Sequence, residues 1–351
     1  MRATAILLLV LTNCPTLHAW SNKEHIQLTR LAAMRLIDDP ATPPEMKTWL
    51  RQITPGLRDM DGEREYFLHA RVGQYPRDVD GIEFWVTVPD LVATFEQHKK
   101  VEPFGVPERL LHFIDLEFFV PDESKRWYKH DLSGKPGPAD VPRDKADPRY
   151  QRAGMLPFRV VHCYGQLVHC LRAKKLTDAP GQFPRDEHAA RWAGYLAHYL
   201  EDNTQPHHAT IDYKSESYFA DKKKAPNIHA EMEYRMGDDE ANDFVALREA
   251  YWPLFVEAME AFEDPVETDD PWASTLEVSM GSYDYLPLIG DAATHANKQG
   301  DAFDTEAFFR FRGEAAGLET SVMEMKARQQ AWAVARVAKM WRRAWDQAHA
   351  K

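Results

Sequence analysis

The chain has few cysteines, no long hydrophobic run and no excess of basic residues. Only three of its 351 residues are cysteine. The one candidate membrane segment, residues 5–11, is far shorter than the roughly 20 apolar residues that a spanning helix needs. Acidic residues exceed basic ones and give a formal net charge of −12, which argues against a protein whose main task is to neutralise a nucleic-acid backbone. An anionic substrate would need a local cationic site.

The first nineteen residues have the features of a secretory signal peptide. Arg2 supplies a positive start, the apolar run follows, and Leu17-His18-Ala19 ends in the small-residue pattern of a cleavage site. We therefore expect a mature domain of residues 20–351 that begins with Trp20 and is secreted or periplasmic. A lipid anchor on Cys14 is the less favoured alternative, because the polar Asn13 stands where such signals need a small residue.

Two cysteines remain in the expected mature domain. Cys163 and Cys170 are seven positions apart in a helical pattern, which places them about 10 Å apart along a helix axis. A disulfide cannot span that distance. The domain is therefore expected to do without a disulfide framework.

Hydrophobic periodicity predicts an all-α fold. Apolar residues recur mostly at helical spacing in nine segments, alternating strand patterns are scarce, and no internal repeat is evident. We therefore expect a single large helical domain, with an irregular connection at 121–152, where proline, glycine, aspartate and lysine are frequent. The nine segments lie near residues 23–36, 45–53, 90–99, 108–119, 156–173, 187–203, 227–236, 240–263 and 305–347.

Two short motifs predict a metal site. His198 and Asp202 are four residues apart, so both side chains lie on one helix face and can reach the same ion. His229 and Glu233 repeat this spacing, and a proline two residues before His208 predicts a turn that returns this third imidazole to the same region. Neutral imidazole together with carboxylate is a ligand set that divalent ions, zinc foremost, prefer.

These motifs resemble those of the zinc-dependent phospholipases C and the single-strand-specific zinc nucleases, which share one all-helical fold around three zinc ions. In that family the mature chain begins with a tryptophan that binds zinc, which matches Trp20, and a nearby histidine matches His25. The segment His112-Phe113-Ile114-Asp115 is similar to another family motif, and Asp90 is matched to the aspartate that precedes it. Asp78 and Asp80 are alternatives for that aspartate.

The resemblance implies three zinc ions per chain and hydrolysis of a phosphodiester. Asp90 would orient or deprotonate the attacking water and would thus be the catalytic residue. The implied ligands are Asp90, His112, His198 and Asp202 for one zinc, His208, His229 and Glu233 for a second, and the terminal amine and carbonyl of Trp20 with His25 and Asp202 for a third.

The substrate is less clearly indicated. Glu233 is the residue type of the phospholipases where the nucleases usually have aspartate, and the paired cysteines common in those nucleases are missing, so phospholipids are favoured. The short spacing from Trp20 to His25 favours the alternative, single-stranded nucleic acid or nucleotide 3'-phosphates. Phe84 and Trp85 are candidates to contact substrate, either at a transient membrane contact or by stacking on bases, although such aromatics are more often core. A zinc-binding protein without turnover is a third interpretation, and no protein partner is predicted.

Overall fold

The computed structural model describes residues 20–69, 79–120, 135–173, 185–237, 244–297 and 303–350. The expected signal peptide, Asp78 and residues 121–134 of the 121–152 connection therefore lie outside the described residues. The fold is all-α, as predicted, with two small hairpins. Its helices are α1 Asn22–Asp38, α2 Pro44–Ile53, α3 Met60–His69, α4 Gly81–Trp85, α5 Val88–Phe95, α6 Tyr150–Ala153, α7 Leu156–Ala173, α8 Arg185–Asp202, α9 Ile228–Ala230, α10 Val245–Ala261, α11 Pro271–Tyr283, α12 Leu286–Ala296, α13 Thr305–Arg310 and α14 Val322–His349.

Strands and short turns of helix complete the fold. The hairpins pair β1 with β2 and β3 with β4, both antiparallel. The strands are β1 Lys100–Val101, β2 Val106–Pro107, β3 Arg312–Ala315 and β4 Leu318–Ser321; the 3₁₀ turns are η1 Glu108–Leu111, η2 Leu116–Phe119, η5 Pro138–Asp140, η6 Pro206–Ala209, η7 Glu216–Tyr218 and η8 Lys222–Lys224; and η9, Glu231–Arg235, is a π-helical turn.

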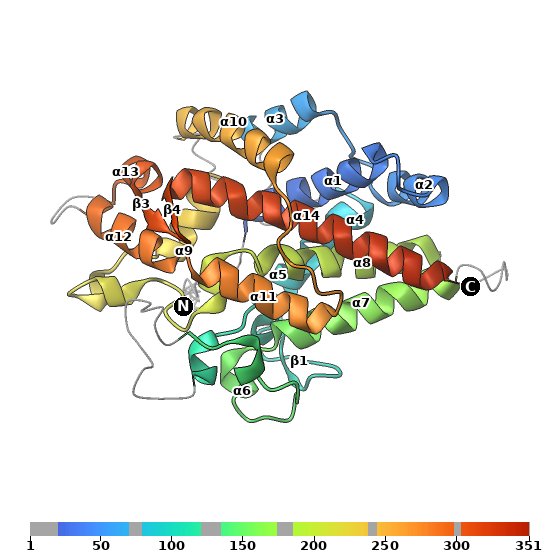
Figure 1. The fold of residues 1–351 in the computed structure, drawn as a ribbon, viewed down its shortest axis with the longest axis horizontal. Helices are drawn as coiled ribbons and strands as arrows, with labels where there is room; N and C mark the ends of the chain where they lie inside the picture. The colour runs from blue at the N-terminus through green and yellow to red at the C-terminus, as the bar shows by residue number, and fades with distance from the viewer. Residues whose placement is uncertain are drawn as a thin grey trace, which may run out of the picture.

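The C-terminal helix α14 is the central support of the molecule. It crosses the middle of the bundle and packs against α1, α7, α8 and α10 (Figure 1). Its N-terminus is closed by a capping box in which Ser321 and Glu324 satisfy each other's backbone N–H groups. The same device, from Ser21 and Glu24, starts α1. Trp341, fully buried on α14, donates its indole N–H to the carbonyl of Ala193 and so joins α14 to α8.

Helix α8 is enclosed by α7, α4, α14 and α1. Gly194 allows the contact with α4, because a Cβ at this position would lie 2.7 Å from Cβ of Trp85 and 2.9 Å from the backbone N of Val86. The C-terminal end of α8 is therefore buried in the bundle, and the polar residues at this end, His198 and Asp202, have no solvent exposure.

The structure corrects several helix predictions. The segment 305–347 is not one helix, because hairpin β3–β4 separates α13 from α14. Ala316 and Gly317 both have positive φ, of 51° and 76°, as a two-residue hairpin turn requires. The hydrophobic pattern alone did not reveal this turn. The predicted segments also do not include helices α3, α4, α11 and α12, and the short helix α6 lies at the end of the stretch predicted to be irregular.

The segment 108–119 is also not a continuous helix. It forms η1 and η2, with a non-helical stretch between them, because its backbone bonds to other segments. The N–H of Ile114 donates to the carbonyl of His208 at 2.9 Å, and the N–H of Asp115 donates to the carbonyl of Ala153 at 2.7 Å. The segment 227–236 begins as α9 and continues as the π-helical turn.

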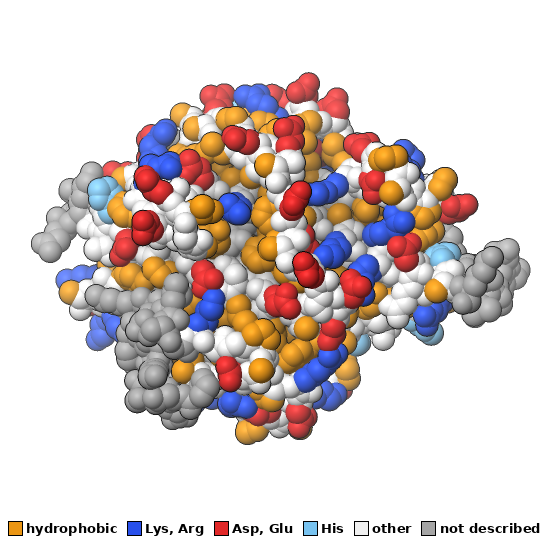
Figure 2. Space-filling model, viewed as in Figure 1, with side chains coloured by type: hydrophobic (Ala, Val, Ile, Leu, Met, Phe, Trp, Pro, Cys, Tyr) orange, Lys and Arg blue, Asp and Glu red, His pale blue; other side chains and the backbone are white. Residues whose placement is uncertain are grey.

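Both remaining cysteines are free thiols, consistent with the predicted lack of a disulfide between them. Within the described part of the chain, no helix combines the length and apolar character that crossing a bilayer requires. Acidic and basic side chains are interspersed over the face in Figure 2.

Two helical glycines provide a test of the packing around α8. Gly194→Ala should lower the free energy of unfolding by about 1–3 kcal/mol, because the added methyl group collides with α4. Gly165→Ala, on the exposed side of α7 with nothing near its Cβ, should raise it by about 0.5–1 kcal/mol through helix propensity. Denaturant unfolding of both variants under identical metal conditions measures the difference. Equal effects of the two substitutions would contradict the close approach of α4.

Candidate metal centre

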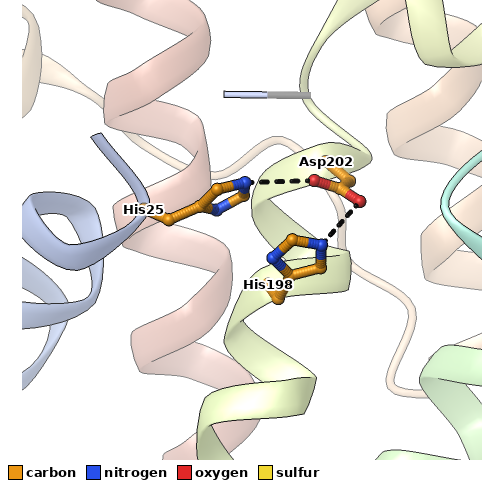
Figure 3. A group of neighbouring side chains, drawn as sticks. All are labelled: His25, His198 and Asp202. Carbon is orange, nitrogen blue, oxygen red and sulfur yellow. Dashed lines mark ion pairs between the residues drawn. The ribbon is translucent and has the colours of Figure 1, made fainter. Parts of the chain in front are cut away.

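Three groups of buried side chains could each hold a metal ion. The first consists of His25 on α1 with His198 and Asp202 on α8 (Figure 3). Nε2 of His25 lies 3.4 Å from Oδ1 of Asp202, and Nε2 of His198 lies 3.3 Å from Oδ2. The two imidazole rings are stacked with centroids 4.3 Å apart. None of the three side chains has solvent exposure.

The second group shares His198 with the first. Oδ1 of Asp90, on α5, lies 3.7 Å from Nδ1 of His112 and 3.7 Å from Nε2 of His198. The two imidazole nitrogens are 3.1 Å apart. Nδ1 of His112 also lies 2.9 Å from Oδ2 of Asp202. The two oxygens of Asp202 therefore face different imidazoles and link both groups.

The third group consists of His208 on η6, His229 on α9 and Glu233 on η9. The Nε2 atoms of the two histidines are 3.2 Å apart, and Nε2 of His208 lies 3.9 Å from Oε1 of Glu233. His229 contacts the same carboxylate, across one helical turn as the sequence spacing predicted. Nδ1 of His208 donates to the backbone carbonyl of His112 at 2.8 Å, which ties this group to the second.

The hydrogen bonds behind the imidazoles leave the inner nitrogens available to a cation. Because the carbonyl of His112 can only accept, His208 must carry a proton on Nδ1, so in the neutral ring its Nε2 presents a lone pair. Within the part of the chain that the structure describes, Nε2 of His25 and Oδ1 of Asp202 are buried and make no hydrogen bond. Buried polar atoms are rarely left in this state. An ion between such nitrogen and oxygen donors would satisfy them, so the residues fit a divalent metal.

The pKa shifts show that this cluster has an excess of negative charge. Burial by itself would lower the pKa of His25, but the hydrogen bond and charge of Glu201 outweigh burial and raise it to about 9. Burial, followed by the charges of Asp90 and Asp202, raises the pKa of Glu233 well above its ordinary value. Carboxylates that repel one another in a low dielectric favour a bound cation.

One carboxylate departs from this trend. Burial alone would raise the pKa of Asp202, but the imidazoles of His198 and His112 hold it well below its ordinary value. Asp202 therefore remains ionised between its histidine neighbours, which is the state in which a carboxylate binds metal.

Trp20 lies beside the first group. Its side chain is fully buried, and its indole N–H donates to the backbone carbonyl of Glu201 at 2.9 Å. Among the alternatives for the first carboxylate, Asp90 is buried in the second group, whereas Asp80 is exposed just before α4. Asp78 lies outside the described residues.

A pocket reaches the third group from outside. It has a volume of about 190 Å³ and is lined by Phe113, Asp115, His207, His208, Ile211, Tyr213 and His229. Burial, together with the charge of Glu117, raises the pKa of Asp115 well above its ordinary value, which favours the neutral carboxyl form. In the sequence, Phe113 and Asp115 stand out only as parts of a motif, and nothing in that motif indicates that they lie beside a cavity.

Phe84 and Trp85 are not among the residues that line this pocket. They lie on α4 in edge-to-face contact, with ring centroids 5.1 Å apart. Trp85 packs against Tyr195 of α8 and the hydrophobic core. The contacts of Trp85 are therefore those of a packing residue.

Comparison with known proteins does not assign the chain to a family. No protein-family model matches the chain, and no curated protein sequence matches it. The metal-binding capacity of the centre is therefore argued from its geometry.

The sharing of Asp202 predicts unequal losses of metal. Asp202→Asn should weaken two sites, because its two oxygens face histidines of two groups, whereas His229→Gln should weaken one. Elemental analysis after equilibrium dialysis should give about one metal ion per chain for the first variant and about two for the second, since losing a ligand typically weakens binding at least as much as the 10–100-fold loss seen for outer partners. Equal losses from the two variants would contradict the shared carboxylate.

Proposed function

We propose that this protein is an exported, zinc-dependent hydrolase of phosphodiester bonds. The observation that carries the proposal is the set of three buried histidine and carboxylate groups with a pocket at the third group. Asp202 and His198 link the first two groups, and the bond from His208 to the carbonyl of His112 joins the third to the second. A structural metal site is usually closed by its four protein ligands, whereas catalytic sites keep a position open. Linked groups beside a cavity fit the catalytic case better.

The residues fit zinc as the resemblance implies. Asp90, His112, His198 and Asp202 would hold one ion, His208, His229 and Glu233 a second, and His25, Asp202 and the backbone of Trp20 a third. Bound zinc would supply Lewis acidity toward a phosphoryl oxygen and would lower the pKa of water.

The side chains of the protein would perform the remaining tasks. Asp90 lies 3.7 Å from the nearest nitrogens of His112 and His198, so its carboxylate is held where it can accept a proton from a nearby water. The hydrogen bond from His208 to the carbonyl of His112 fixes the position of the third group relative to the second. Burial of the centre excludes bulk water and strengthens its interactions with an anionic phosphoryl group.

The charge of the centre accounts for an anionic substrate on an acidic protein. Three divalent cations would exceed the charge of the three ligand carboxylates, Asp90, Asp202 and Glu233. The metal centre would then be a local positive site although the chain carries a net charge of −12.

Export is part of the same proposal. An α-amine binds metal only in its neutral form and only at a free terminus. Cleavage after Ala19 would create that terminus at Trp20. The side chain of Trp20 is fully buried, and its indole N–H donates a hydrogen bond to the carbonyl of Glu201 on α8.

Phospholipids are the first candidate substrate. Glu233 is the phospholipase residue type, and Ile211, which is 51% exposed, places an apolar side chain at the pocket. Phe113 and Tyr213 supply aromatic rings to the lining, and such rings attract a quaternary ammonium head group.

Nucleotides and single-stranded nucleic acid are the second candidate. The neutral form of Asp115 that its raised pKa favours can donate a hydrogen bond, and the same aromatic rings can stack on a base. A neutral Asp115 favours an uncharged nucleobase in the pocket.

A direct comparison of substrates tests the proposal. The mature protein should hydrolyse phosphatidylcholine vesicles, lose this activity with chelator and regain it with zinc. Activity on single-stranded DNA is measured in parallel. Hydrolysis that persists in chelator would refute the zinc mechanism, whereas hydrolysis of DNA alone would establish the second candidate in place of the first.

Asp115→Asn separates the two candidates by pocket chemistry. If the pocket takes a quaternary ammonium group, the bound cation would favour the ionised form of Asp115, and Asp115→Asn, which cannot ionise, should raise KM for phosphatidylcholine roughly tenfold. If the pocket takes a base, the asparagine amide still donates a hydrogen bond, and KM for DNA should change by only a few-fold. Asp140→Asn, an exposed carboxylate on η5, is the matched control. An unchanged KM on both substrates would exclude this pocket from substrate binding.

A further inference from the structure

A second buried carboxylate lies immediately beside Asp202. Glu201 is fully buried on α8 and is absent from all three candidate metal groups. Consecutive helical residues point about 100° apart, so the two carboxylates point in different directions and contact different ring nitrogens of His25. Asp202 faces the imidazoles of the metal centre, and Glu201 faces α1.

Glu201 makes contacts with both of its oxygens. Oε2 lies 2.6 Å from Nδ1 of His25, and Oε1 accepts a hydrogen bond from the hydroxyl of Thr29 at 2.9 Å. His25 and Thr29 are four residues apart, so they lie on the same face of α1. The backbone carbonyl of Glu201 accepts a hydrogen bond from the indole N–H of Trp20 at 2.9 Å. Glu201 thus contacts each of the two N-terminal residues that are expected to bind the third zinc.

The bond to Nδ1 determines which nitrogen of His25 can bind an ion. The hydroxyl of Thr29 donates to one carboxylate oxygen, and the proton on Nδ1 of His25 donates to the other. In the neutral ring, which is the form that binds metal, this arrangement leaves the lone pair on Nε2, and Nε2 lies 3.4 Å from Oδ1 of Asp202. Histidine ligands of metals commonly have such a carboxylate partner, which fixes their tautomer and increases their basicity.

We propose that Glu201 is a positioning residue that prepares His25 for the metal shared with Asp202. The inference rests on the proposed zinc centre and adds a residue outside its ligand sets. Glu201 acts through His25: it holds the ring orientation and the tautomer, and it places a negative charge behind the ligand that faces the cation.

The test is zinc binding by the mature protein with Glu201→Gln, which keeps the shape of the side chain and removes its charge. At a free zinc concentration that just saturates the unmodified protein, this variant should bind two zinc ions per chain, and the third should return at roughly 10–100-fold higher free zinc. The matched control is Glu63→Gln, a buried carboxylate of α3 that accepts a hydrogen bond from Gln27 and belongs to none of the three candidate groups. This control should bind three.

Thermal unfolding distinguishes positioning from a structural role. If Glu201 only held α1 against α8, Glu201→Gln would lower Tm equally with zinc and with chelator and would still bind three zinc ions with unchanged affinity, which would overturn the proposal. Positioning predicts a larger drop in Tm with zinc than with chelator. If the variant does not fold, Thr29→Val, which removes the hydroxyl that holds Oε1, should weaken one zinc several-fold, and unchanged binding there would overturn the proposal as well.

The unmodified protein separates this inference from the proposed function. Binding of three zinc ions without hydrolysis of any phosphodiester would refute the function and leave the role of Glu201 testable. Failure to bind zinc would remove the centre on which both depend.

Discussion

A carboxylate enclosed by imidazoles is the constraint on which this structure depends. Asp202 has no solvent exposure, and its oxygens face His25 on one side and His112 and His198 on the other. Removing such a charge from water costs several kcal/mol unless partners of opposite charge replace the solvent. Those partners come from segments far apart in the chain, so the fold has to bring α1, the η1–η2 region and α8 together at one point.

The surrounding helices maintain this point by packing. Helix α14 contacts α1, α7, α8 and α10, and Trp341 joins it to α8 through a buried hydrogen bond. Gly194 allows α4 to close over the other side of α8. The resulting apolar shell lowers the local dielectric constant. This strengthens hydrogen bonds and ion pairs inside the shell and makes any unpaired charge there more costly. A cation bound at this centre would therefore stabilise the fold, because it would contact the same side chains that the fold buries.

Much of the fold followed from hydrophobic periodicity, but interruptions did not. The long helices α7, α8 and α14 have sustained apolar patterns, so their existence could be read from the sequence. The β3–β4 hairpin could not, since two consecutive residues with positive φ leave little signal in a pattern of apolar residues. Similarly, η1 and η2 replace a predicted helix because the backbone of Ile114 and Asp115 bonds to distant carbonyls, and no local propensity reports such bonds.

The sequence by itself determined the ligand types and the local pairs, because residues four apart share a helix face: His198 with Asp202, and His229 with Glu233. Only the tertiary structure decided which pairs meet. It brought Asp90 rather than Asp80 to His112, placed Phe113 and Asp115 beside the cavity at the third group, and set Glu201 behind His25. The physical reason is that these contacts join segments up to 176 residues apart. Their geometry depends on how whole helices pack, and spacing along the chain carries no record of that.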